Sequence, residues 1–278
     1  MPFPGKRTLN IAIAIGALVV PTALLLGQPR AITALRLARG YSPLDADARV
    51  YYETGAEYLA EAIADALPAA VTRVERRQLA PFEVAFRVYV CASHESFTRR
   101  IGGPVTSPVR GIAFPRDIWV SPRAFSFHGK DTHRETVAHE LSHVHLGQKM
   151  SWLRRVRGVP SWFQEGLADW VADTGHEQVS RHEARAAVAA GSCIVPEGSG
   201  RLRLAPKPPP SGLPWPMFHA QSRMFVEYLR SRGANEFDGF LVAVLRGAEF
   251  EAAFGESFHI SLLEAWSDFQ ESMQPVPR

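Results

Sequence analysis

The sequence predicts an α+β fold: a small mixed sheet packed on a helix near residue 140, then a mainly helical C-terminal lobe, with an apolar helix at the N-terminus. Three observations lead to it. An uncharged apolar run covers residues 9–27, short segments expected to form strands lie between residues 86 and 120, and apolar residues recur at helical spacing from residue 132 onward. About 250 residues follow the apolar run, enough for one large domain or two lobes.

The apolar run Leu9–Gly27 is long enough to cross a bilayer, since 19 residues of helix span about 28 Å. Lys6 and Arg7 precede it, and no small-x-small cleavage site is obvious at its end. The run is either a signal anchor or a cleaved signal peptide. We favour an uncleaved anchor within residues 1–30, followed by a juxtamembrane linker over residues 31–44.

The orientation of this anchor is only weakly encoded. Lys6, Arg7 and the terminal amine favour a cytoplasmic N-terminus, whereas Arg30, Arg36 and Arg39 oppose it almost equally. We expect a single-pass membrane protein whose main domain lies outside the cytoplasm. If the segment is cleaved, the domain is expected to be secreted or periplasmic.

Residues 45–278 are expected to form one domain, with the sheet and its central helix up to about residue 150 and the helical lobe after it. An apolar stripe predicts a first helix over residues 46–67. Residues 191–216, rich in Gly and Pro, are expected to form a long loop that either borders the functional site or is a surface excursion. The other helices are expected at residues 180–190, 218–232, 234–246 and 259–273.

The segment His139-Glu-Leu-Ser-His143 carries the strongest chemical signal. A capping box formed by Thr132 and Glu135 predicts a helix over residues 132–146, which places the two imidazoles one turn apart on one face. Two His at this spacing can bind one zinc ion, and Glu140 between them can accept a proton from water that the metal activates.

A second helix is predicted to start at Ser161, with Gln164 completing a capping box. Glu165 in its first turn is the candidate third zinc ligand, since catalytic zinc usually has three protein ligands and one open position. Asp169, one turn later, is expected to accept a hydrogen bond from the back nitrogen of one ligand His. We expect Gly166 to permit close approach of the two helices around the metal.

A Glu in a first helical turn is more often a surface carboxylate. Here it is flanked by four apolar residues that predict a buried helix, where a carboxylate needs a cation or a donor: Trp162, Phe163, Leu167 and Trp170. His133 and His145 point away from the ligand face and are expected to be non-ligands, His133 as a solvated neighbour of the helix cap.

His-Glu-Leu-Ser-His followed by Trp162-Phe-Gln-Glu-Gly-Leu-Ala168 resembles the gluzincin metallopeptidases, in particular the bacterial peptidase MA-like domains. The resemblance covers about residues 45–272. It implies that His139, His143 and Glu165 bind zinc, that Glu140 is the general base and that Asp169 supports a ligand. It also implies strands at residues 86–90, 111–115 and 118–120 and a later helix over residues 221–229.

The chain departs from the family at one position. Such domains often carry a Tyr two residues before a Gln-Ser pair, where this chain has His219. An imidazole can also donate to a developing oxyanion, so His219 is a catalytic candidate, with a helix-start histidine of no role as the alternative. Tyr228 is a second candidate, or a core tyrosine.

The resemblance implies zinc-dependent hydrolysis of peptide bonds, with one Zn²⁺ per chain and a peptide or protein as substrate. In this family an extended substrate pairs with an edge strand beside the active helix. Residues 111–121 are placed to be that edge, because Pro115 and Pro122 suit an edge strand better than a central one.

Charge and cysteine content add limited information. The net charge of +3 with no long basic run excludes a nucleic-acid partner. Basic residues at 149–157 are expected to lie in the loop between the two zinc helices, either solvated or touching anionic lipid or an acidic substrate. Cys91 and Cys193 lack metal-ligand spacing and could pair in an oxidising compartment.

Two other functional classes stay open. The domain could hold zinc and bind peptides without cutting them, although the intact base Glu140 counts against this. It could also be a membrane-tethered structural module in which the His pair is a coincidence of core packing.

Overall fold

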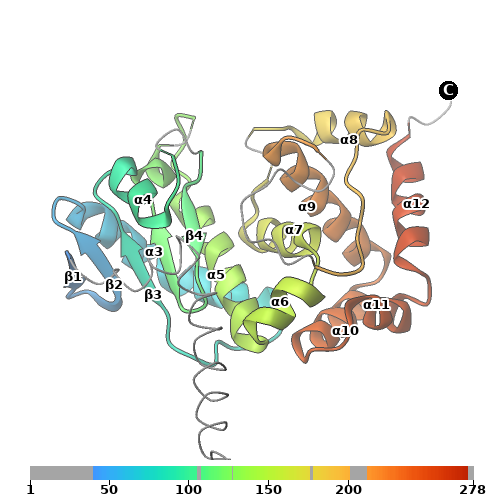
Figure 1. Ribbon diagram of the computed structural model, residues 1–278, viewed down its shortest axis with the longest axis horizontal. Helices are drawn as coiled ribbons and strands as arrows, with labels where there is room; N and C mark the ends of the chain where they lie inside the picture. Colours follow the sequence, from blue (N-terminus) through green and yellow to red (C-terminus); the bar gives the residue numbers. More distant parts are fainter. Residues whose placement is uncertain (1–39, 105–107, 127, 176–177, 201–211, 275–278) are drawn as a thin grey trace, which may run out of the picture.

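The computed structural model of the chain describes residues 40–274 apart from 105–107, 127, 176–177 and 201–211. A lobe containing a sheet and a helical lobe lie side by side (Figure 1). The expected N-terminal membrane segment lies outside the described residues. Among the helices that are described, none combines the length and the apolar character that a membrane crossing requires.

The sheet is mixed and has five strands among the described residues, in the order β1-β2-β3-β5-β4. The inner pairs β2–β3 and β3–β5 are parallel, and the outer pairs β1–β2 and β4–β5 are antiparallel. The expected mixed sheet is therefore confirmed, with β4 at one edge. The strands are β1 (Tyr41–Leu44), β2 (Asp47–Glu53), β3 (Arg87–Val90), β4 (Gly111–Ala113) and β5 (Asp117–Val120).

The prediction of a helix starting at residue 46 is wrong. Residues 47–53 form β2, and the helix α3 covers Glu57–Arg77. Val50, Tyr51 and Tyr52 pair with β3, and β-branched and aromatic residues favour such a pleated surface. Gly55 adopts a left-handed conformation at φ 91° and separates the strand from the helix.

The helix α5 (His133–Lys149) agrees with the sequence prediction to within a few residues, but its cap does not. Thr132 makes no capping hydrogen bond with its side chain. Asp131 instead accepts a hydrogen bond from the His133 backbone N–H at 3.2 Å. The sequence analysis also missed the strand β1 at the end of the expected linker, the helix α4 (His94–Ile101), the 3₁₀ turn η1 (Pro122–Phe125) and the helix α11 (Phe250–Phe258).

All regular secondary structure in the described part of the C-terminal lobe is helical, as expected. The segment expected as a loop between the zinc helices instead forms the helix α6. The expected helix at 259–273 is α12, which begins at Leu262, and the helix α11 before it was not expected. A capping box between Ser261 and Glu264 starts α12. The helices are α6 (Trp152–Gly158), α7 (Ser161–Ala172), α8 (Arg181–Ala189), α9 (Trp215–Arg232), α10 (Ala234–Leu245), α11 (Phe250–Phe258) and α12 (Leu262–Met273).

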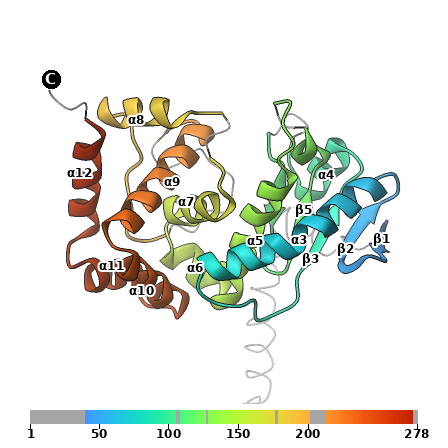
Figure 2. The same cartoon turned by 180° about the vertical axis from the view of Figure 1, so that it is seen from behind.

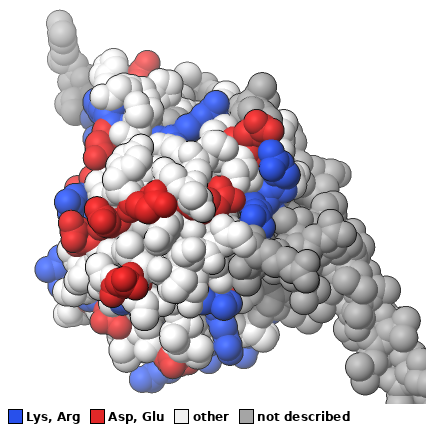
Figure 3. All heavy atoms as spheres, turned by 90° about the vertical axis from the view of Figure 1, so that its left-hand side faces the viewer, with Lys and Arg blue, Asp and Glu red and all other residues white. Residues whose placement is uncertain are grey.

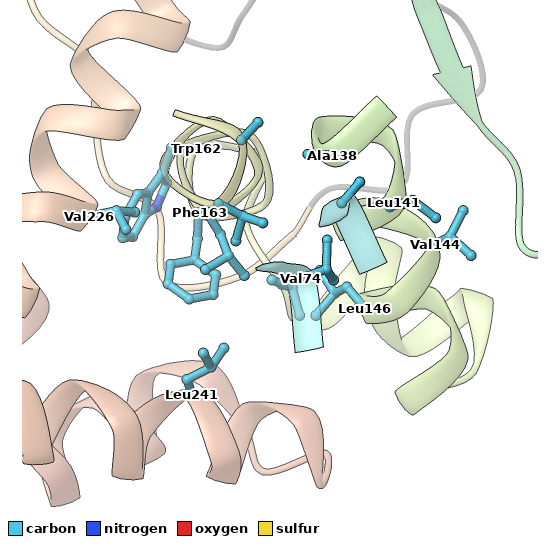
Figure 4. Packing of buried hydrophobic residues seen from close by; sticks show 14 of the residues in the cluster. Val74, Ala138, Leu141, Val144, Leu146, Trp162, Phe163, Val226 and Leu241 are labelled. Carbon is cyan, nitrogen blue, oxygen red and sulfur yellow. The ribbon is translucent and has the colours of Figure 1, made fainter. Parts of the chain in front are cut away.

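One hydrophobic core runs through both lobes (Figure 4). Val74 of α3 and Leu146 of α5 pack on the sheet-lobe side, and Phe163 of α7 lies beside them, facing Leu241 of α10. Trp162 and Val226 continue the core into α9. Because the core is shared, α5 and α7 are held side by side where the lobes meet, as the two opposite views show (Figures 1 and 2).

The surface charges at the β1 end are mixed, and neither cysteine forms a disulfide. On the face at the β1 end, acidic and basic side chains are interspersed among other residues (Figure 3). Both cysteines are free. Burial raises the pKa of Cys91 to about 12, and its sulfur lies 3.1 Å from the Tyr41 hydroxyl, so it behaves as a packed core residue.

His145 is fully buried on the side of α5 that faces away from the candidate ligands, as the sequence predicts for a non-ligand. Its Nε2–H donates to the Ala80 carbonyl at 2.8 Å, while Nδ1 is buried without a partner. Burial therefore lowers the pKa of His145 to about 4.

This histidine predicts an acid-sensitive contribution to stability. The folded pKa of about 4 lies below the unfolded value of about 6.5, so the unfolded state binds the proton first and folding weakens as pH falls between these values. The loss should reach about 1 kcal/mol at pH 5.5 and about 3 kcal/mol below pH 4. Urea unfolding of metal-free wild type and His145→Gln at pH 7.5 and 5.5 tests this, since Gln keeps a donor for Ala80. A stability difference that is the same at both pH values would refute the assignment.

Candidate metal centre

Three side chains from two helices converge at the junction of the lobes: His139 and His143 of α5 and Glu165 of α7. The two Nε2 atoms lie 3.2 Å apart, and Glu165 Oε2 lies 3.4 Å from His139 Nε2 and 3.3 Å from His143 Nε2. Four ligands at about 2.0–2.1 Å from zinc in a tetrahedral arrangement are separated by about 3.3–3.4 Å. The three donors thus have the spacing of three corners of a tetrahedral zinc site.

The donor types also suit zinc. Two imidazoles and one carboxylate are typical of catalytic zinc sites, whereas calcium and magnesium prefer oxygen ligands throughout. The side chains of His139, His143 and Glu165 are 15%, 13% and 25% exposed, so solvent reaches the site. Burial alone would raise the pKa of Glu165, but the adjacent His143 and His139 hold it well below its usual range, as an anion.

Asp169 supports two imidazoles at once. Its Oδ1 lies 2.9 Å from His139 Nδ1 and its Oδ2 lies 2.8 Å from His219 Nδ1, while the Thr174 hydroxyl donates to Oδ1 at 2.9 Å. Because an ionised carboxylate only accepts hydrogen bonds, both Nδ1 atoms carry protons. Burial raises the pKa of Asp169, but His219 and His139 outweigh it and lower the value, which keeps the carboxylate charged.

His219 faces the same centre from α9. Its Nε2 lies 3.9 Å from Glu165 Oε2. Among the described residues, the donor atoms of His139, His143 and Glu165 all lie within 4.8 Å of one another, and His219 is outside this group. Burial lowers the pKa of His219, but the charge and the hydrogen bond of Asp169, together with the charge of Glu165, more than reverse this, so the net shift is upward. The structure thus places the imidazole next to the ligands without making it a fourth one.

Glu140 lies on the sheet side of the centre, buried to 8% exposure. Gly111, the first residue of the edge strand β4, lies so close that a Cβ added to it would be 2.8 Å from Glu140 Cγ. Burial raises the pKa of Glu140, opposed by His139 and His143, and the net shift is upward. A raised pKa suits a general base that works near neutral pH.

Gly166 does mark a close approach, but not between the two zinc helices. A Cβ at this position would lie 2.5 Å from the Ser222 carbonyl oxygen of α9. The glycine therefore lets α7 pack against α9, the helix that carries His219. This contact brings Asp169 within hydrogen-bond distance of His219.

We expect Gly166→Ala to destabilise the fold, although alanine is the better helix former by about 1 kcal/mol. The clash is with backbone atoms, which side-chain movement cannot relieve, so a net loss of about 1–3 kcal/mol is expected. Gly239→Ala on α10 is the matched control, because nothing lies within 4 Å of its added Cβ. Chemical denaturation should show the control at least as stable as wild type. Equal stability of the two variants would contradict the packing argument.

Three details of the sequence analysis need correction. Ser161 is the first residue of α7 rather than its cap, which is Pro160, and Gln164 Nε2 donates to the Val159 carbonyl at 2.9 Å instead of completing a capping box. His133 is buried at 5% exposure, stacked on Phe125, rather than solvated. Its Nδ1 lies 2.5 Å from the Asp131 carboxylate.

The second oxyanion candidate, Tyr228, is not brought to the centre. Its ring packs against Phe225 and Phe269, and its hydroxyl accepts a hydrogen bond from Arg232 at 2.9 Å. The core alternative for Tyr228 is therefore the better description. The sequence analysis missed Thr174, which has no recognisable motif, and the link between Asp169 and His219, which joins residues 50 positions apart.

Comparison with known proteins adds no family assignment. No protein-family model matches the chain, and none of the curated proteins matches it either. The functional argument therefore stands on the geometry of the centre.

Proposed function

We propose that the chain is a zinc-dependent metallopeptidase of the gluzincin type. The observation that carries this proposal is the convergence of His139, His143 and Glu165, at the mutual spacing of tetrahedral zinc ligands, beside the buried carboxylate of Glu140. A bound zinc ion would supply a Lewis acid that acidifies water and polarises a carbonyl.

The chain's own side chains account for the remaining steps. Glu140 accepts a proton from the attacking water and passes it to the leaving amine. Asp169 keeps the protons of His139 and His219 on Nδ1, which turns Nε2 of His139 toward the metal. His219 is placed to stabilise negative charge that develops on the substrate carbonyl oxygen.

The edge strand supplies a place for the substrate backbone. Residues 111–121, expected as the edge, form two antiparallel strands, of which only β4 is at the edge and β5 is internal. Because Gly111 lies against Glu140, a peptide that adds to β4 would run past the general base. A complex with the substrate on another surface would remove this part of the proposal.

Location and anchoring follow from the sequence alone. We infer a single-pass anchor at residues 1–30 with the domain outside the cytoplasm, and a peptide or protein as substrate rather than nucleic acid. Detergent extraction and protease accessibility of the full chain in membranes test the anchor and its orientation.

Metal analysis combined with digestion of a broad peptide library tests the function directly. The chain, purified without chelator, should contain about one zinc and cleave peptides, and a chelator should abolish cleavage until zinc is restored. Zinc without hydrolysis would support a silent peptide-binding domain. Absence of zinc would support a structural module with a coincidental His pair.

A further inference from the structure

Trp215, at the start of α9, is 47% exposed, although tryptophan is highly buried on average in folded proteins. It lies one helical turn before His219, and the two ring centroids are 5.9 Å apart. An exposed aromatic ring thus borders the imidazole that faces the candidate metal ligands.

The ring of Trp215 is held by its neighbours. It meets the ring of Phe218 edge to face, at 5.6 Å and 86° between planes, and Phe218 is itself 2% exposed. An aromatic ring fixed against the core in this way keeps its outer face available without further ordering.

Trp215 borders the candidate metal centre through His219. His219 Nε2 lies 3.9 Å from Glu165 Oε2, and the ring of Trp215 lies beside the ring of His219. If the scissile carbonyl of a bound peptide lies next to His219, the side chain of the adjacent peptide residue would therefore be within reach of the indole. On the opposite side of the centre, Gly111 presents no side chain and lies against Glu140. Trp215 thus places an exposed apolar ring on the His219 side of the centre.

We propose that Trp215 forms a substrate subsite for a large apolar or aromatic side chain adjacent to the scissile bond. This deepens the proposed peptidase function and rests on it. A specificity-determining role predicts that Trp215 changes which peptides are cleaved while leaving the chemistry of cleavage intact. Burial of one apolar side chain in such a subsite typically discriminates roughly 10- to 200-fold.

Paired peptides that differ only in one residue flanking the cleaved bond, Phe or Ala, test the subsite. Wild type should prefer the Phe peptide by about 10-fold or more in kcat/KM. Trp215→Ala should lose most of this preference, with less than about a threefold change on the Ala peptide, and Trp215→Phe should keep most of it. Tyr58→Ala is the control, because Tyr58 is a 69% exposed aromatic residue on α3 and belongs to neither the metal centre nor the subsite.

Binding provides a second readout that needs no turnover. Calorimetric titration of zinc-loaded Glu140→Gln, with and without Trp215→Ala, should show about a 10-fold weaker affinity for the Phe peptide when the indole is removed. Retained preference in the cleavage assay, or equal affinities in the titration, overturns the subsite. Tight Trp215-dependent binding with no cleavage by wild type would retain the subsite and overturn the peptidase proposal instead.

Discussion

Replacing Glu140 by glutamine should lower kcat by roughly 10²- to 10⁴-fold, the usual contribution of a positioned general base. Gln has the same shape but cannot accept and return the proton. Glu140 is not among the three candidate ligands, so zinc affinity should stay within a few-fold of wild type. The measurements are peptide turnover and zinc content of the same preparations.

A matched variant separates this effect from general damage to α5. Glu135 lies on the same helix, one turn toward its start, so Glu135→Gln makes the same chemical change away from the centre. It should turn over peptides like wild type. A Glu140→Gln protein that cleaves normally, or one that cannot take up zinc, would show that Glu140 has another role.

Replacing Glu165 by alanine should weaken zinc binding by more than about 100-fold. This loss exceeds the 10- to 100-fold fall in metal affinity that is typical when a residue hydrogen-bonded to a ligand is removed. Glu165 is the one anionic member of the candidate ligand set found among the described residues, so this change leaves two neutral imidazoles to hold the ion. Competition with a chromophoric chelator measures the change, and the zinc-dependent rise in thermal stability should disappear with it.

Asp169→Asn provides the graded comparison. It keeps both ligand imidazoles but presents an NH2 group in place of one of the two accepting oxygens, so zinc affinity should fall by about 10- to 100-fold, less than in Glu165→Ala. Wild-type affinity in Glu165→Ala would exclude Glu165 as a ligand. Equal losses of zinc affinity in the two variants would mean that Asp169 contributes more to zinc binding than its contacts with His139 and His219 indicate.

The centre was predictable because its chemistry is local in sequence. His139 and His143 are set by helical spacing, and Glu165 and Asp169 by the same spacing on α7. What joins the two helices is tertiary packing, such as the contact between Gly166 and Ser222, and no short-range pattern encodes it. The role of Gly166 was therefore assigned to the wrong helix pair.

The errors in the fold have a common physical origin. Residues 47–53 carry apolar residues compatible with either a helix or a buried strand, and pairing with β3 decided in favour of the strand. Similarly, the expected side-chain caps at Thr132 and Ser161 do not form: Asp131 accepts the hydrogen bond at the start of α5, and Pro160 is the N-cap of α7. Local propensity is a weak guide where long-range contacts compete with it.

The candidate ligands come from helices on either side of the lobe junction, α5 and α7. A cation bound there would link the two helices, because moving one helix away from the other would separate Glu165 from the two imidazoles. Zinc binding and contact between the lobes would therefore be coupled. A change that separates the lobes should weaken zinc binding, and loss of zinc should make separation of the lobes easier. Zinc availability would then affect the folding stability of the protein as well as its proposed activity.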